Sequence, residues 1–238
     1  MISPPKMVHA KEKVPVIAID GPVGSGKGTI ARNISHELGY NLLDSGALYR
    51  LVAFQTINAG VIISSENELK IAQIAANIDV KFSRGDISQE QVYLSGKEVS
   101  KEIRTEECGR LASNVAALPA VRKGLLELQK RFRSAPGLVA DGRDMGTTVF
   151  PDAILKIYLT ASVDERANRR LKQLNDKGID VSLAALLRDI GNRDKRDSER
   201  KVAPLKRASD ARILDSSNLT IEEVSQMILG WVKERSPA

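Results

Sequence analysis

Residues 20–29, DGPVGSGKGT, lie between an apolar run, VPVIAI, and an amphipathic stretch, IARNISHEL. A glycine-rich turn between a strand and a helix points consecutive backbone N–H groups inward, where they bind phosphate at the positive end of the helix. The spacing of Gly21, Gly26 and Lys27 fits the P-loop pattern, in which the lysine reaches the β- and γ-phosphates. This segment therefore predicts a strand, a phosphate-binding turn and a helix, and with them a nucleotide site.

The residue after Lys27 departs from the P-loop pattern. An ordinary P-loop has serine or threonine there, and its hydroxyl binds Mg²⁺, whereas this chain has Gly28 followed by Thr29. We therefore expect Mg²⁺, the cofactor that accompanies ATP, to be bound mainly through water and phosphate oxygens. We assign no residue as a direct metal ligand.

The size and composition of the chain indicate one globular domain. Its 238 residues can form one hydrophobic core with lobes inserted into it. No apolar run approaches the ~20 residues of a membrane helix, and residues 1–13 lack the apolar region of a secretory signal. We therefore expect a cytoplasmic protein without a membrane partner, with residues 1–13 as a short disordered lead. The single cysteine, Cys108, permits no internal disulfide and no cysteine-rich metal site.

The net charge of +6 points to an anionic partner, which could be a nucleic acid, a membrane or a phosphorylated small molecule. Aromatic residues are only 4% of the chain, and the basic residues are not interleaved with exposed Phe or Tyr. Single-stranded nucleic acids are usually bound by stacking on such aromatics. Free nucleotides are therefore the better fit, and no nucleic-acid partner is expected.

The order of apolar runs indicates an α/β fold with a central parallel sheet. The runs VPVIAI, YNLLD, GLVAD, LKIYL and RILD alternate with helical stretches, as in a parallel sheet covered on both faces. Some ninety residues separate the second and third runs, which is too many for one crossover. Within them, residues 62–102 predict a small lobe, with a helix in ENELKIAQIAANI and antiparallel strands in DVKFS and QVYLS around a turn at 84–86.

Polar residues follow the predicted strands and gather on two helices. In an open parallel sheet, ligands bind at the carboxyl ends of the strands, so the segments DSGALYR (44–50) and DGRD (141–144) should converge on the phosphate turn. Helical spacing places Arg193, Asp197 and Arg200 on one face, and three further arginines share a face of the preceding helix, which begins at a capping box, Ser162-x-x-Glu165. These three are Arg166, Arg169 and Arg170. A second capping box, Thr220-x-x-Glu223, precedes the last helix.

An excess of arginine suits transfer of a phosphoryl group to a phosphate. In phosphoryl transfer the protein chiefly positions groups and neutralises charge. An alcohol acceptor would call for an aspartate base, whereas a monophosphate, with a second pKa of about 6, is already ionised at neutral pH. The arginines therefore favour a monophosphate acceptor.

Several motifs then resemble those of the bacterial cytidylate kinases, which are nucleoside monophosphate kinases. The motifs are DGPVGSGKGT, LLDSGALYR, EIRT, ADGRDMGT, VFPDA and the RD...RD...R...APL pattern, and the resemblance runs from about Val14 to the C-terminus. It implies a single domain with the three-layer P-loop NTPase fold. The core would be residues 14–61, 103–160 and 204–238, the inserted nucleoside-monophosphate lobe 62–102, and a helical lid 161–203. A monomer is also implied.

The resemblance assigns roles to residues at matching positions. ATP is expected to contact the phosphate turn and two lid arginines: Gly21, Pro22, Val23, Gly24, Ser25, Gly26, Lys27, Gly28, Thr29, Arg166 and Arg170. CMP or dCMP is expected to contact Ser45, Arg50, Ser113, Arg122, Arg143, Asp144, Arg193, Asp197 and Arg200. The catalytic group would be Lys27, Arg143, Arg193 and Asp141. Asp141 either orders water around Mg²⁺ near Thr29 or braces its loop, and the sequence does not choose between these roles.

Other functions remain open at this point. A P-loop kinase for UMP, AMP or a small alcohol would share the phosphate turn and differ only in the residues that read the acceptor. A GTPase is disfavoured because the chain has no Asn-Lys-x-Asp segment. A basic ATPase that binds nucleic acid would explain the charge but not the segments DSGALYR and DGRDMGT.

Overall fold

The fold is described here from a computed structural model, covering residues 13–83, 91–176 and 178–235. The turn expected at 84–86, and the N-terminal lead apart from residue 13, lie outside these ranges. Within them, no helix has both the length and the apolar character needed to cross a membrane.

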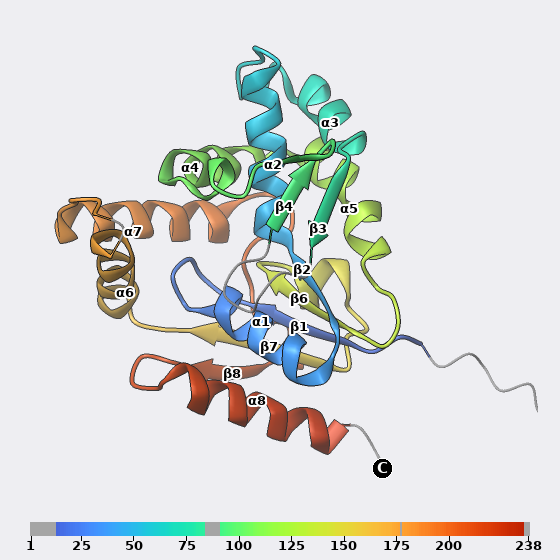
Figure 1. Ribbon diagram of the computed structural model, residues 1–238, viewed down its shortest axis with the longest axis vertical. Coiled ribbons are helices and arrows are strands. Elements are labelled where there is room, and N and C mark those ends of the chain that lie inside the picture. Colours follow the sequence, from blue (N-terminus) through green and yellow to red (C-terminus); the bar gives the residue numbers. More distant parts are fainter. Residues whose placement is uncertain (1–12, 84–90, 177, 236–238) are drawn as a thin grey trace, which may run out of the picture.

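A parallel sheet runs through the centre of the molecule (Figure 1), with its strands in the order β2-β6-β1-β7-β8. Every neighbouring pair in this order is parallel. Each strand overlaps one of the predicted apolar runs and ends within one residue of it. The strands are β1 (Val16–Asp20), β2 (Asn41–Asp44), β6 (Leu138–Gly142), β7 (Leu155–Thr160) and β8 (Arg212–Asp215). All residues of β1 and β6 are buried, because helices cover both faces of a parallel sheet.

Two helical layers enclose the sheet and confirm the predicted three-layer α/β fold. Alternate side chains of β1 enter opposite cores, with Val16 and Ala18 on one side and Ile17 and Ile19 on the other. The Ile17 side is closed by α1 (Lys27–Leu38) and α8 (Ile221–Arg235). The Val16 side is closed by α2 (Ser45–Asn58), α4 (Glu106–Val115) and α5 (Pro119–Arg131).

The segment 62–102 contains the predicted helix and strands. The helix is α3 (Glu68–Ala76), and the strands β3 (Val80–Ser83) and β4 (Gln91–Leu94) pair antiparallel. A short third strand, β5 (Lys97–Glu98), was not predicted. Ile71 and Val92 belong to the same hydrophobic cluster as the α2 side of the sheet, so this segment packs directly on the main core.

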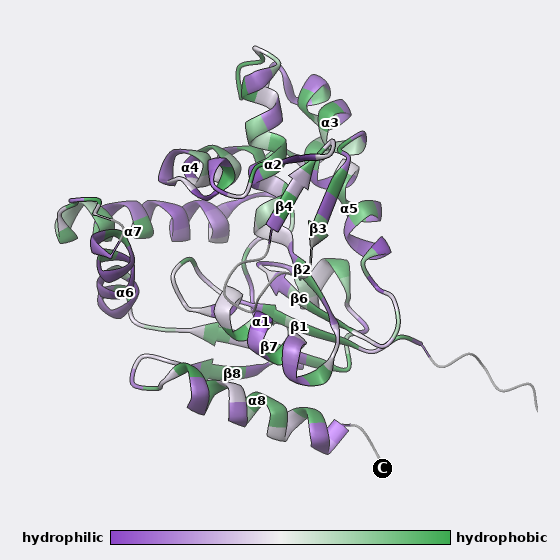
Figure 2. Ribbon diagram, in the orientation of Figure 1, coloured by the Kyte–Doolittle hydropathy of each residue, from purple (hydrophilic) through white to green (hydrophobic). Residues whose placement is uncertain are grey.

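Two polar helices, α6 (Val163–Asn175) and α7 (Leu183–Glu199), stand at one end of the sheet. Figure 2 shows both coloured mainly as hydrophilic, unlike the strands of the sheet. They pack on each other through a small cluster of their own: Ala167, Leu174, Leu186 and Ile190. The described residues also form two short helical turns, η1 (Glu102–Arg104) and η2 (Met145–Val149).

The helix ends correct two of the predictions and confirm a third. Arg200 is extended, with ψ of 140°, so it caps α7 and does not continue the face that carries Arg193 and Asp197. The capping box at Ser162 is half formed: its hydroxyl accepts from the Glu165 N–H at 3.1 Å, but the Glu165 carboxylate accepts from Arg169 instead. Thr220 and Glu223 form both halves of the second box, as predicted.

Candidate active site

The phosphate loop, residues 21–26, joins β1 to α1. Gly24 and Gly26 have φ of 77° and 87°, in the left-handed region that favours glycine. A Cβ on Gly21 would lie 2.0 Å from the carbonyl oxygen of Leu159, so a side chain does not fit there. No side chain caps α1, which leaves its first N–H groups available to an anion.

Lys27 is the first residue of α1 and is buried, with its Nζ donating to the Pro22 carbonyl at 2.9 Å. Burial, with help from nearby Arg143, lowers the pKa of Lys27 to about 8. Asp141, Asp197 and Asp44 oppose this shift, so carboxylates from β6, α7 and β2 surround one ammonium group. The strand ends therefore do converge on the phosphate loop.

Asp141 lies close to Gly28, the residue that follows Lys27. Asp141 Oδ2 lies 3.2 Å from where a Cβ on Gly28 would stand, so a side chain at Gly28 would crowd the carboxylate. Asp141 and Asp44 are register partners on β6 and β2. Burial raises the pKa of Asp141 to about 7, with Lys27 acting against the shift and Asp44 adding to it.

The oxygen atoms beside the phosphate loop suit a hydrated magnesium ion. No group of three or more His, Cys, Asp or Glu side chains in the described ranges could hold a metal by itself. Mg²⁺ usually keeps several waters and takes one or two carboxylates together with substrate phosphates. The adjacent carboxylates of Asp44 and Asp141 meet that requirement, and the Thr29 hydroxyl near Arg32 offers a further oxygen atom.

We predict that Asp141→Asn raises the melting temperature by a few degrees at pH 8 and by clearly less at pH 5. The folded pKa, about 7, lies above the ordinary aspartate value of 3.8. Stability from the neutral carboxyl is therefore complete below pH 3.8, declines as the pH rises from 3.8 to 7, and is lost above pH 7. Asparagine has no charge to desolvate.

Calorimetry at the two pH values measures this difference. Asp210→Asn is the control, because Lys156 lowers the pKa of the exposed Asp210 and that group is ionised at both values. The prediction would be contradicted if Asp141→Asn changed the melting temperature equally at both pH values, as is expected for Asp210→Asn.

A buried carboxylate, that of Asp144, lies between two arginines and forms one wall of the site. Asp144 follows β6, pairs with Arg122 of α5 through Oδ2, and lies 3.4 Å from Arg200 through Oδ1. The Arg122 guanidinium also lies 5.5 Å from the centre of the Tyr49 ring. Ser113 of α4 is buried, and its hydroxyl has no hydrogen-bond partner among the described residues.

Three arginines, Arg50, Arg143 and Arg193, lie close enough for their charges to affect one another. Arg143 donates from Nε to Asp197 at 2.7 Å. Burial lowers the pKa of Arg193 to about 10, and Arg143 and Arg50 add to the shift. Arg50 donates to the carbonyls of Ile103 and Thr105 at 2.7 and 3.0 Å. An anion bound here would relieve the repulsion among these guanidinium groups.

Ser45 and Gly109 shape the same region. Ser45 begins α2 and is buried against β6, where a Cβ on Gly142 would lie 2.7 Å from its hydroxyl. A Cβ on Gly109 would lie 2.7 Å from the Arg50 guanidinium, so glycine at this point of α4 lets Arg50 reach the site.

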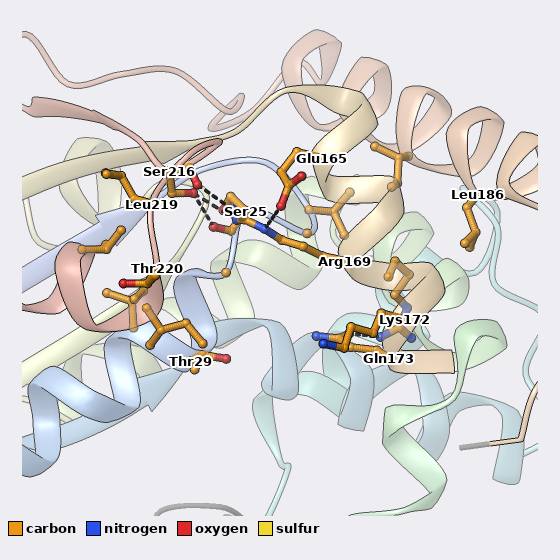
Figure 3. Close-up of a pocket in the computed structure, with 18 of the residues that line it drawn as sticks. Ser25, Thr29, Glu165, Arg169, Lys172, Gln173, Leu186, Ser216, Leu219 and Thr220 are labelled. Atoms are coloured by element: carbon orange, nitrogen blue, oxygen red, sulfur yellow. Dashed lines mark hydrogen bonds and ion pairs between the residues drawn. The ribbon is translucent and has the colours of Figure 1, made fainter. Parts of the chain in front are cut away.

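A cavity of about 720 Å³ opens between the phosphate loop, α6, α7 and the start of α8. Figure 3 shows Arg169 directed toward Ser216 beside Ser25 of the loop, with Leu219 and Thr220 nearby. Arg169 donates to the Ser216 hydroxyl at 3.1 Å, and this hydroxyl lies 3.3 Å from the Ser25 carbonyl. The cavity is large enough for a nucleotide.

The cavity is also lined by residues that were not predicted to belong to the site, among them Arg169, Ser216, Leu219 and Thr220. Residues 216–220 could have been predicted as part of the site, because they follow β8, whose carboxyl end lies at the ligand-binding edge of the sheet. The segment DSSNLT carries no motif that is typical of a ligand site, so only the place of β8 in the sheet could have indicated it.

The two predicted lid arginines lie in different surroundings. Arg170 lines the cavity and pairs with Glu106 of α4. Arg166 is buried, donates to the carbonyl oxygens of Val23 and Ala161 at 3.0 Å each, and pairs with Asp194 at 2.6 Å. Arg166 therefore holds the phosphate loop through the Val23 carbonyl and does not line the cavity.

Comparison with known proteins identifies the family. A family model described as cytidylate kinase matches residues 17–234. The chain belongs to the cytidylate kinase family. The cytidylate kinase of Pseudomonas aeruginosa strain PAO1 is 58% identical over 225 residues, covering 92% of this chain and 97% of that one. That of Azotobacter vinelandii is 54% identical over 224 residues, covering 94% and 97%.

Similarity to solved structures is weaker. The shikimate kinase from Acinetobacter baumannii in complex with shikimate has a TM-score of 0.43 and 18% identity, covering 95% of this chain and 97% of that one. TT1252 from Thermus thermophilus has a TM-score of 0.45 and 19% identity, covering 95% and 100%. Membership of the cytidylate kinase family therefore rests on the sequence matches.

Proposed function

We propose that this chain transfers the γ-phosphoryl group of ATP to CMP or dCMP, giving ADP with CDP or dCDP. The observation that carries the proposal is the buried Asp144 carboxylate between Arg122 and Arg200. A group of arginines lies between this carboxylate and the phosphate loop. The chain also belongs to the cytidylate kinase family. The proposal includes action as a cytoplasmic monomer.

ATP lies in the cavity with its phosphates on residues 21–29. The glycines and the N-terminus of α1 supply N–H groups, and Lys27 and Arg170 supply charge. Arg166 takes part indirectly by holding the Val23 carbonyl. The division into a core (14–61, 103–160, 204–238), an inserted lobe (62–102) and a lid (161–203) belongs to the same proposal, and the separate cluster of α6 and α7 supports the lid.

The acceptor phosphate lies among Arg50, Arg143 and Arg193, facing the γ-phosphate. No general base is needed, because a monophosphate oxygen is already ionised at neutral pH. Lys27, Arg143 and Arg193 stabilise the negative charge on the oxygens during transfer. Mg²⁺, held near Thr29 and Asp141, would neutralise phosphate charge and help to align the two nucleotides. Ser45 and Asp197 position the acceptor with Arg200.

The base is selected by hydrogen-bond polarity. Cytosine offers an N4 amino donor beside the N3 and O2 acceptors, which suits the Asp144 carboxylate and the Arg122 guanidinium, with Ser113 alongside. Uracil offers an O4 acceptor and an N3–H donor at the same places, so both contacts become unfavourable. Each unpaired polar group costs about 1–3 kcal/mol.

A coupled ADP-release assay across CMP, dCMP, UMP, AMP and GMP tests the function. We expect kcat/KM for CMP and dCMP to exceed that for UMP by roughly 10- to 100-fold, with AMP and GMP excluded by ring size. UMP used as well as CMP, or AMP used better, would overturn the cytosine assignment. ATP hydrolysis stimulated by DNA or RNA, with no monophosphate dependence, would overturn the kinase assignment.

A further inference from the structure

Asp20, the last residue of β1, makes an unusual connection across the site. It is 5% exposed, and its carboxylate accepts the backbone N–H of Met145 through Oδ1 and that of Gly146 through Oδ2, both at 2.8 Å. These two residues begin η2, the helical turn that follows Asp144. A residue next to the phosphate loop thus holds the backbone beside the base-reading carboxylate.

This contact leaves the Asp144 side chain free for another role. Asp144 is the residue before η2, where an aspartate usually caps the following N–H groups with its own carboxylate. Here its side chain makes no such cap, while Asp20 accepts from the first two N–H groups of the turn. The Asp144 carboxylate turns instead to Arg122 and Arg200.

Asp20 keeps this position at an electrostatic cost. Burial raises the pKa of Asp20 to about 6, and nearby Asp144 adds to the shift. A neutral asparagine would avoid that cost, but its amide has only one acceptor oxygen. A carboxylate is the side chain of this size that accepts from both N–H groups at once.

We propose that Asp20 is a positioning residue for base selection, which fixes the direction of the Asp144 carboxylate by capping η2 from the neighbouring strand. The proposal rests on the proposed function, because it takes Asp144 to read the cytosine amino group. Asp20 itself does not touch the nucleotide.

The test compares Asp20→Asn with Asp152→Asn, which makes the same change at a more exposed carboxylate just after η2. We measure kcat/KM for CMP and UMP, the KM for ATP and the melting temperature. Asp20→Asn should lower the CMP-to-UMP preference roughly tenfold, mainly by raising the KM for CMP. The KM for ATP should change less than about twofold, and Asp152→Asn should leave the preference unchanged.

Asp20→Glu covers the case in which Asp20→Asn does not fold. It keeps both acceptor oxygens but moves them by one methylene group in a site where Asp20 is 5% exposed, so a smaller loss of the CMP-to-UMP preference is expected. The role of Asp20 would be overturned if kcat/KM fell equally for CMP and UMP, or if neither variant changed the CMP-to-UMP preference. A wild-type enzyme without CMP preference would instead overturn the proposed function.

Discussion

Lys27→Met is expected to lower turnover about a thousandfold while the fold is retained. Lys27 places a fixed positive charge at the phosphate loop, where it stabilises negative charge that develops on the transferred group. Methionine has a similar length and fills the same buried space. Because burial already lowers the pKa of Lys27 to about 8, removing the charge should not reduce the melting temperature.

The measurement is steady-state turnover with saturating ATP and CMP, beside a thermal melt. Lys233→Met is the matched control, since Lys233 is exposed on α8 and does not line the cavity. We expect less than a threefold change for the control. A folded Lys27→Met protein within threefold of wild type, roughly 0.7 kcal/mol of barrier, would be incompatible with the proposed site.

Asp144→Ala is expected to lower kcat/KM for CMP by about 10- to 100-fold and to change that for UMP much less. The substitution removes the acceptor for the cytosine amino group. It also removes an ionised group that faces the O4 lone pair of uracil, so the preference between the two substrates narrows. Parallel assays with CMP and UMP measure the preference directly.

The loss of Asp144 also leaves two nearly buried guanidinium groups, Arg122 and Arg200, without their shared carboxylate. A lower melting temperature is therefore expected as well. Asp144→Asn separates the two effects, because it keeps one acceptor oxygen and should retain part of the CMP preference. If both folded variants kept the full wild-type preference, Asp144 would not read the base.

Local features of this protein could be predicted from the sequence because they depend on residues close together in the chain. The phosphate loop needs only left-handed backbone at Gly24 and Gly26 and space at Gly21. The strands follow from short apolar runs, and the cap at Thr220 follows from a partner three residues away. The resemblance to a family then supplied roles that the residues alone left open.

Contacts between distant segments could not be read from any local pattern. The strand order places Asp44 beside Asp141, almost a hundred residues apart, and this pairing accounts for the carboxylates beside Lys27. Asp20 reaches Met145 and Gly146, and Arg169 reaches Ser216, only after the sheet and α6 have packed. Glu165 likewise accepts a hydrogen bond from Arg169 and does not complete its capping box.

The sequence by itself therefore determined the fold class, the strands and the phosphate loop, since backbone conformation and hydrophobic periodicity act over a few residues. Only the tertiary structure decided which carboxylate meets which cation, that Arg200 leaves the α7 helix, and that Arg166 braces the loop outside the cavity. Those outcomes depend on burial and on long-range packing, where each charged group pairs with whichever partner the assembled core brings within reach.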